Sequence, residues 1–130
     1  MALRCFIVDD SPHFVDAARA LLERGGLPVI GVASTTDEAL RRVEELKPDV
    51  VLVDVELGQE SGFDLARRFQ LETTLDRSKV ILISTYAEED LEDLVTAAPV
   101  AAFLSKSHLS VRAIREIVDN PGHSDASRRS

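Results

Sequence analysis

Three apolar runs in this 130-residue chain end directly in charged residues. A buried strand that is followed at once by a charge places that charge at the rim of a sheet. Three carboxylates and one ammonium gathered on a single rim could bind a divalent metal and a phosphoryl group. The charged residues are Asp9 and Asp10 after the run 6–8, Asp54 after the run 50–53, and Lys106 after the run 101–105.

These groups match the needs of phosphoryl transfer, in which positioning and charge neutralisation do most of the work. Two carboxylates about 4 Å apart repel by roughly 4 kcal/mol at an effective dielectric constant of about 20, so the cluster needs a proton or a cation. Oxygen ligands favour Mg²⁺, which Asp9, Asp10 and Asp54 would bind. Lys106 and the hydroxyl of Ser84 would contact phosphoryl oxygens, and Asp54 would accept the group as an acyl phosphate.

Each signal also has a structural explanation when it is taken alone. An acidic pair such as Asp9-Asp10 is typical of a polar turn that complements the positive N-terminus of the next helix. Asp54 could likewise lie near a helix end and cap it. The combination favours a site, because neighbouring first and third strands would bring all three carboxylates into one crevice.

The elements that must position these residues follow from the hydrophobic pattern. Ser11-Pro12 is a helix start, apolar residues 14, 17, 18, 21 and 22 share one helical face, and Gly25-Gly26 ends that helix. Strands and helices alternate five times, which predicts an α/β fold with a doubly wound parallel sheet. The predicted strands are 3–8, 28–33, 50–54, 80–84 and 101–105, and the predicted helices are 12–24, 36–47, 63–69, 88–96 and 110–118.

Composition excludes several classes of protein. The formal net charge of −8 argues against direct nucleic-acid binding. No apolar stretch approaches the roughly 20 residues that span a bilayer, and the start of the chain shows no signal-peptide pattern. The single cysteine, Cys5, lies within the first strand and indicates a reduced, cytoplasmic setting. We expect one domain over residues 1–119 and a disordered tail over 120–130, because the tail lacks apolar residues.

On these residues the chain resembles the receiver domains of two-component response regulators, over about residues 3–119. The resemblance implies a flavodoxin-like sheet with strand order 2-1-3-4-5 and a Mg²⁺ site made by Asp9, Asp10, Asp54 and the backbone carbonyl of Glu56. It also implies that Asp54 is the phosphoacceptor. The remaining family positions are Ser84 as the switch hydroxyl, Lys106 as the phosphate-contacting lysine, Phe103 as the switch aromatic and Gly62 as the glycine after the third strand.

Two positions depart from the family pattern. Gly58 stands where receivers usually have proline, four residues after the acceptor, and suggests a more mobile loop. Ser107 follows Lys106 where receivers usually have a proline in a cis bond. A cis bond to a non-proline residue costs roughly 2.5 to 4 kcal/mol, so we expect either a trans bond or a strained cis bond here. Glu56 and Tyr86 occupy positions that tune phosphate lifetime in the family.

The resemblance implies a stand-alone switch that a histidine kinase or phosphotransfer protein phosphorylates on Asp54. Output would pass to a protein partner through the face formed by the fourth helix, the fifth strand and the fifth helix, which could also form a homodimer. Two alternatives are a phosphorylation-independent pseudo-receiver and the isolated receiver of a DNA-binding regulator. A haloacid-dehalogenase phosphatase is disfavoured because its Asp-x-Asp follows the first strand, and an FMN carrier because Asp9-Asp10 would repel the phosphate. His13, His108 and His123 show no metal-ligand spacing.

Overall fold

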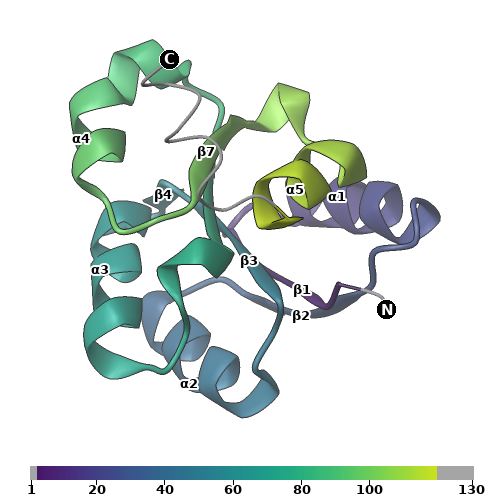
Figure 1. Ribbon diagram of the computed structural model, residues 1–130, viewed down its shortest axis with the longest axis horizontal. Coiled ribbons are helices and arrows are strands. Elements are labelled where there is room, and N and C mark those ends of the chain that lie inside the picture. The colour runs from purple at the N-terminus through teal and green to yellow at the C-terminus, as the bar shows by residue number, and fades with distance from the viewer. Residues whose placement is uncertain (1–2, 120–130) are drawn as a thin grey trace.

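The computed structural model describes residues 3–119, so the tail predicted for 120–130 lies outside the described residues. Strands and helices alternate along the chain, with a short β-hairpin after the third strand (Figure 1). The strands are β1 (Cys5–Val8), β2 (Val29–Ala33), β3 (Val50–Asp54), β4 (Glu56–Leu57), β5 (Glu60–Ser61), β6 (Val80–Ser84) and β7 (Ala102–Ser105). The α-helices are α1 (Pro12–Arg24), α2 (Thr36–Leu46), α3 (Gly62–Glu72), α4 (Glu92–Ala97) and α5 (Val111–Asp119), and the 3₁₀ helices are η1 (Arg77–Lys79), η2 (Glu88–Leu91) and η3 (Lys106–His108).

The central sheet is parallel and has the order β2-β1-β3-β6-β7. Counted over the five strands of this sheet, the order is 2-1-3-4-5, so the predicted fold class and strand order are confirmed. The central strands β1, β3 and β6 are buried along their whole length, which explains why their sequences are continuously apolar rather than alternating. Their carboxyl ends therefore meet at one edge of the sheet.

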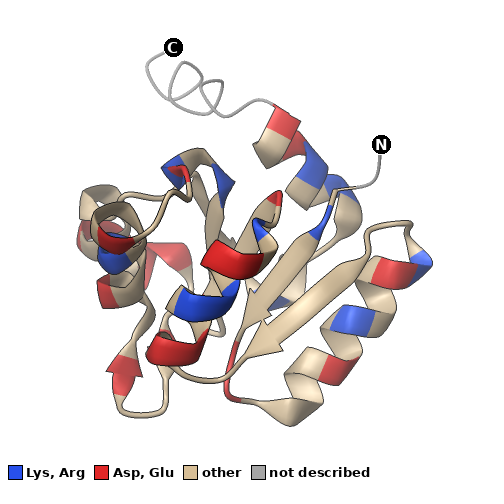
Figure 2. Ribbon diagram, turned by 90° about the horizontal axis from the view of Figure 1, so that it is seen from below, with Lys and Arg blue, Asp and Glu red and all other residues tan. Residues whose placement is uncertain are grey.

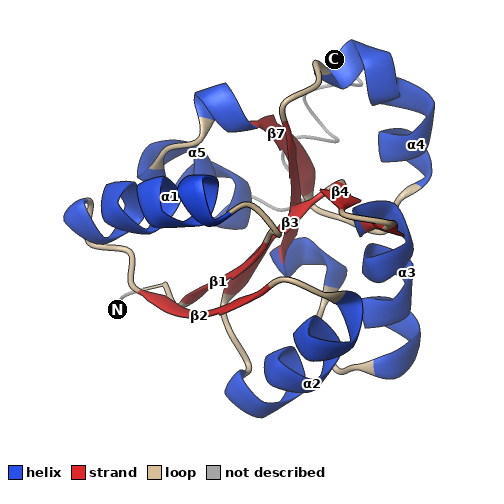
Figure 3. Ribbon diagram, turned by 180° about the vertical axis from the view of Figure 1, so that it is seen from behind, coloured by secondary structure: helices blue, strands red, loops and turns tan. Residues whose placement is uncertain are grey.

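Two apolar layers hold the helices against the sheet. One side carries α1 and α5, and the other carries α2, α3 and α4 (Figures 1 and 3). Alternate residues of each strand feed these two layers, as the pleat requires. Ile7 of β1 contributes to the first layer and Phe6 to the second.

Side-chain caps fix where three of the helices begin. Ser11 accepts a hydrogen bond from the Phe14 N–H, Thr35 from the Glu38 N–H, and Ser61 from the N–H groups at the start of α3. The predicted starts of α1 and α2 are therefore confirmed within one residue. The structure begins α1 directly after the Asp9-Asp10 pair, so this cap also sets the geometry of the rim.

Three local predictions were wrong. The buried face of α1 carries Val15, Ala18 and Leu22, whereas Ala17 and Leu21 are exposed. The run of apolar residues is wide enough to fit two adjacent helical faces, and packing on the sheet selects one of them. The stretch predicted as a single helix over 88–96 is divided into η2 and α4, and neither start has a side-chain cap.

The third difference lies in residues 57–62, to which the sequence pattern assigns neither a strand nor a helix. They form the antiparallel hairpin β4–β5, in which Leu57 pairs with Glu60 across Gly58 and Gln59. Gly58 has φ = 63° and Gln59 does not have a positive φ, which is the pattern of a type II′ turn. Across residues 3–119 no helix is long and apolar enough to cross a membrane.

Candidate phosphoryl-acceptor site

The charged rim predicted from the sequence is assembled at the carboxyl ends of β1, β3 and β7. Because β1 and β3 are direct neighbours, Val8 lies beside Val53, and the residues that follow carry their carboxylates into one crevice. Carboxylate oxygens of Asp9, Asp10 and Asp54 lie within 4.8 Å of one another. Asp9 and Asp54 are buried and Asp10 is exposed, so the cluster has one side open to solvent.

Lys106 spans the two buried carboxylates. Its Nζ lies 2.8 Å from Asp9 Oδ2 and 3.3 Å from Asp54 Oδ2. Burial alone would lower the pKa of Lys106, but the hydrogen bond and charge of Asp9 and the charge of Asp54 outweigh it, so the pKa is raised. The ammonium therefore stays protonated at the acceptor.

Asp54 has a carboxyl group whose surroundings oppose ionisation. Burial raises its pKa to about 6, and the negative charge of Asp9 acts in the same direction. The Glu56 N–H, 3.1 Å from Asp54 Oδ1, and the charge of Lys106 lower the pKa in part. A further positive charge at this rim would favour the ionised form that a nucleophile needs.

The donor set fits a hard divalent cation. All three carboxylates offer oxygen, and the exposed position of Asp10 leaves room for the waters that Mg²⁺ retains. Asp9 Oδ2 is buried, and the Lys106 ammonium, 2.8 Å away, is its one close polar partner among the described residues. A buried carboxylate oxygen with so few polar partners is suited to bind a metal ion.

The Lys106–Ser107 peptide bond, for which the sequence leaves both a trans and a strained cis form open, is trans. Residues 3–119 contain no cis peptide bond, and Lys106 to His108 form the 3₁₀ helix η3. The trans alternative is therefore the one observed. It does not turn Lys106 away from the crevice, because the long side chain still reaches both carboxylates.

Ser84 and Phe103 lie near the rim without touching the charged cluster in the contacts described. Ser84 is buried at the end of β6, where its hydroxyl accepts a hydrogen bond from the Tyr86 N–H at 3.0 Å. Phe103 is buried in β7 and belongs to the apolar layer under α4. Both residues connect the rim to the segment that leads into η2 and α4.

Two glycines shape the chain beside the acceptor. Gly58 adopts a φ that proline cannot reach, which explains the departure from the usual family residue. A Cβ on Gly62 would lie 2.1 Å from the Asp54 carbonyl oxygen, so only glycine fits there. The loop that follows the acceptor is thus a defined hairpin, closed by the Gly62 N–H, which donates to the carbonyl oxygen of Val55, the residue after β3, at 2.9 Å.

Sequence reasoning missed two residues of the site. The Ser11 N–H donates to Asp9 Oδ1 at 2.8 Å, and the Phe14 ring lies beneath the Lys106 ammonium. Ser11 was recognised only as a helix cap and Phe14 only as an apolar residue of α1. The Ser11 contact is local, since an Asp side chain often accepts a hydrogen bond from the N–H two residues on. The Phe14 contact has no local signal, because it depends on where β7 delivers Lys106.

Comparison with known proteins agrees with this geometry. The response regulator receiver domain family matches residues 5–119, and the chain belongs to this family. A protein-glutamate methylesterase/protein-glutamine glutaminase of Hahella chejuensis is 37% identical over 94 residues, which are 72% of this chain and 26% of that protein. The response regulator GacA of Pseudomonas viridiflava is 31% identical over 80% of this chain and 48% of its own length.

The chain therefore spans less than half the length of these two relatives. Among solved structures, the signal receiver domain of NarL from Mycobacterium tuberculosis has a TM-score of 0.72 at 26% identity, covering 92% of this chain and 96% of that chain. A LuxR-family response regulator from Aurantimonas has a TM-score of 0.79 at 24% identity, covering 92% of this chain and 87% of that chain. It shows the shared fold.

Proposed function

We propose that this receiver domain is a Mg²⁺-dependent phosphorylation switch whose acceptor is Asp54. The observation that carries the proposal is the convergence of Asp9, Asp10, Asp54 and Lys106 on one rim of the sheet. The donor is a histidine kinase or a phosphotransfer protein, as the family implies. The domain would work in the cytoplasm, in keeping with its one unpartnered, buried cysteine, Cys5.

Asp9, Asp10 and Asp54, with the backbone carbonyl of Glu56, would hold Mg²⁺. The cation would neutralise the charge that develops on the transferred phosphoryl group. Its positive charge would also lower the pKa of Asp54 from its raised value, so that the carboxylate is ionised. The Glu56 N–H orients Asp54 by holding Oδ1.

In the transfer step, an Asp54 oxygen forms a bond to phosphorus and the bond between phosphorus and the donor's imidazole nitrogen breaks. The electron pair of that bond stays on the nitrogen. Lys106 leaves Asp9 and pairs with a phosphoryl oxygen, and the Ser84 hydroxyl donates to another. Hydrolysis of the acyl phosphate resets the domain, and Glu56 and Tyr86 flank the approach of water.

Recruitment of the Ser84 hydroxyl would disturb the segment that leads to η2 and α4. In the structure the Ser84 hydroxyl accepts a hydrogen bond from the Tyr86 N–H, and Phe103 packs in the apolar layer beneath α4. We propose that Phe103 readjusts in that layer when Ser84 moves. The face formed by α4, β7 and α5 would then present a changed surface to a downstream protein.

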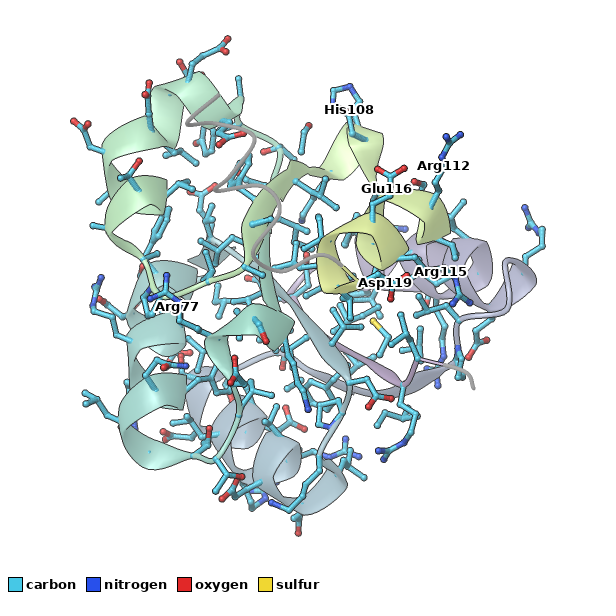
Figure 4. All side chains as sticks on the ribbon, in the orientation of Figure 1. Arg77, His108, Arg112, Arg115, Glu116 and Asp119 are labelled. Atoms are coloured by element: carbon cyan, nitrogen blue, oxygen red, sulfur yellow. The ribbon has the colours of Figure 1, made fainter. Side chains whose placement is uncertain are left out.

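The two sides of this face differ in charge. The stretch 80–105 contains no lysine or arginine and carries five acidic residues, which lie in η2 and α4. On the other side His108, Arg112 and Glu116 project outward from η3 and α5 (Figure 4). The outer faces of the helices carry both signs of charge, while the strands are almost wholly uncharged (Figure 2). A protein partner or a second copy of the chain could be recognised through this asymmetry.

The test is phosphorylation by acetyl phosphate with and without Mg²⁺, followed by intact-protein mass spectrometry. Wild type should gain one phosphoryl group only with Mg²⁺, and Asp54→Asn should gain none. Asp16→Asn, which removes an exposed carboxylate on the outer surface of α1, is the matched control and should behave as wild type. No incorporation into folded wild type would instead identify a phosphorylation-independent binding module.

A further inference from the structure

The Lys106 ammonium has a third partner besides the two carboxylates. Its Nζ lies 4.2 Å from the centroid of the Phe14 ring. An ammonium at this distance over an aromatic face is attracted by the negative electrostatic potential of the ring. The contact is shielded from water, since only 13% of the Lys106 side chain is exposed, and shielding strengthens it.

Phe14 is itself fixed by the residues that form the rim. The Phe14 N–H donates to the Ser11 hydroxyl, the Ser11 N–H donates to Asp9 Oδ1, and Asp9 Oδ2 pairs with Lys106. The contacts thus form a closed circuit from Asp9 through Ser11 and Phe14 to Lys106 and back to Asp9. These contacts hold the backbone of Phe14 beside the metal-binding pair, and the Phe14 side chain packs against the apolar layer under α1 and α5.

The three partners of Lys106 differ in what happens when a cation binds. Asp9 and Asp54 would give oxygen atoms to Mg²⁺, and their attraction for the ammonium would fall. The Phe14 ring offers no ligand atom to a metal ion, so its attraction for the ammonium is not reduced when a cation binds. It is therefore the partner of Lys106 whose attraction persists in the state that receives the phosphoryl group.

The backbone beside Lys106 explains why a contact that restrains the ammonium matters in this chain. Ser107 follows the lysine in a trans bond, and the side chain reaches the crevice from the short helix η3. A flexible four-carbon side chain leaving a single turn of 3₁₀ helix loses rotamer entropy when it is held. A fixed aromatic face restricts the ammonium before the phosphoryl group arrives.

We propose that Phe14 is a positioning residue that keeps the Lys106 ammonium beside Asp54 while the carboxylates bind the cation. This inference rests on the proposed function, since it assigns Phe14 a part in the same phosphoryl transfer. Phe14 contacts neither the metal ligands' oxygens nor the phosphoryl group in this role. It acts through Lys106 alone.

The kinetic test compares Phe14→Leu, which keeps apolar bulk, with Phe14→Tyr, which keeps the ring. At saturating Mg²⁺ and acetyl phosphate, the phosphorylation rate should fall about five- to tenfold in Phe14→Leu and recover in Phe14→Tyr. The Mg²⁺ dissociation constant, measured by calorimetry, should change less than about twofold, because the carboxylates are unaltered. Equal rates in wild type and Phe14→Leu would overturn the proposal.

A double-mutant cycle separates positioning from packing. In the Lys106→Met background, which removes the charge but keeps an unbranched apolar side chain, Phe14→Leu should cause no further loss of rate. An equal loss in both backgrounds would show that Phe14 acts through the fold of α1, and would refute the positioning role. Urea unfolding of each variant identifies any that are not folded at the assay temperature.

A second readout does not depend on phosphorylation. The Phe14 ring current should shift the Lys106 ε-methylene proton resonances upfield in the wild-type protein with Mg²⁺ bound, and Phe14→Leu should remove that shift. An unshifted resonance in Mg²⁺-bound wild type would overturn the inference even if Asp54 is phosphorylated normally. If wild type shows the ring-current shift but accepts no phosphoryl group, the contact stands and the proposed function, with the kinetic role of Phe14, is refuted.

Discussion

Asp54 is held in surroundings that favour its protonated form, and this has a consequence for stability. The pKa of Asp54 is raised to about 6 in the folded protein, chiefly by burial, against an ordinary value of 3.8. Between these two values the folded state binds the proton that the unfolded state has lost, so stability falls as the pH rises from about 4 to 6. Above pH 6 the ionised carboxylate destabilises the metal-free fold by up to about 3 kcal/mol.

Asp54→Asn should remove that destabilisation. Without Mg²⁺ at pH 7.5, we expect the variant to be about 1–3 kcal/mol more stable than wild type, and the gap should close as the pH approaches 4. Urea unfolding of both proteins across this pH range checks the prediction. Stability curves that run parallel over the whole range would contradict the raised pKa.

Asp10 tests the metal site separately from the fold. Its carboxylate is exposed, so Asp10→Asn should change the free energy of unfolding by less than about 0.5 kcal/mol in the absence of metal. Loss of one charged ligand should weaken Mg²⁺ binding by about tenfold or more. Calorimetric titration measures the affinity, and Asp16→Asn serves as the control because Asp16 lies outside the cluster.

At the scale of elements, the hairpin β4–β5 connects the acceptor strand to two helices. Gly62 starts α3 in contact with the backbone of Asp54, and Glu60 accepts a hydrogen bond from the Thr36 N–H at the start of α2 at 2.9 Å. The carboxylate of Glu60 also lies favourably at the positive end of that helix. The second strand of the hairpin is therefore held at the start of α2 and beside the backbone of the acceptor.

Gly58 determines whether this hairpin can form. Gly58→Pro should destabilise the protein by about 1–3 kcal/mol, because proline cannot adopt the φ of 63° found there. Asparagine tolerates a positive φ, so Gly58→Asn should lose less than half as much stability as Gly58→Pro. Thermal unfolding compares the two, and equal losses would show that side-chain bulk near Asp10, rather than φ, governs the position.

At the scale of the whole molecule, α4 is the element best suited to change. It has six residues, neither it nor η2 has a side-chain cap, and Leu94 is 52% exposed. By contrast α2 has a cap at Thr35 and the additional bond from Glu60. Elements with few stabilising contacts open most readily, so a signal from the acceptor would be expressed in α4.

Phosphorylation should therefore alter amide hydrogen exchange in η2, α4 and β7 by about threefold or more, with little change in α2. Exchange measured with and without acetyl phosphate and Mg²⁺ tests this. Asp54→Asn should show no difference between the two conditions. A change confined to the residues adjoining Asp54 would argue that output does not pass through the α4–β7–α5 face.

The sequence by itself determined the sheet, its strands and the charges at their ends. Continuous apolar runs are a local property, and a charge at the end of a run follows the strand wherever the fold places it. This is why Asp9, Asp10, Asp54 and Lys106 could be predicted to lie together. The starts of α1 and α2 followed for the same reason, because their caps are made by adjacent residues.

The tertiary structure decided everything that depends on contacts between distant segments. Packing on the sheet selected the buried face of α1, since its apolar residues fit more than one face. The pairing of Leu57 with Glu60 converted an apparent loop into a hairpin. The place of Phe14 beneath Lys106 depends on residues 92 positions apart, on strand order and on a side-chain rotamer, none of which a local pattern encodes.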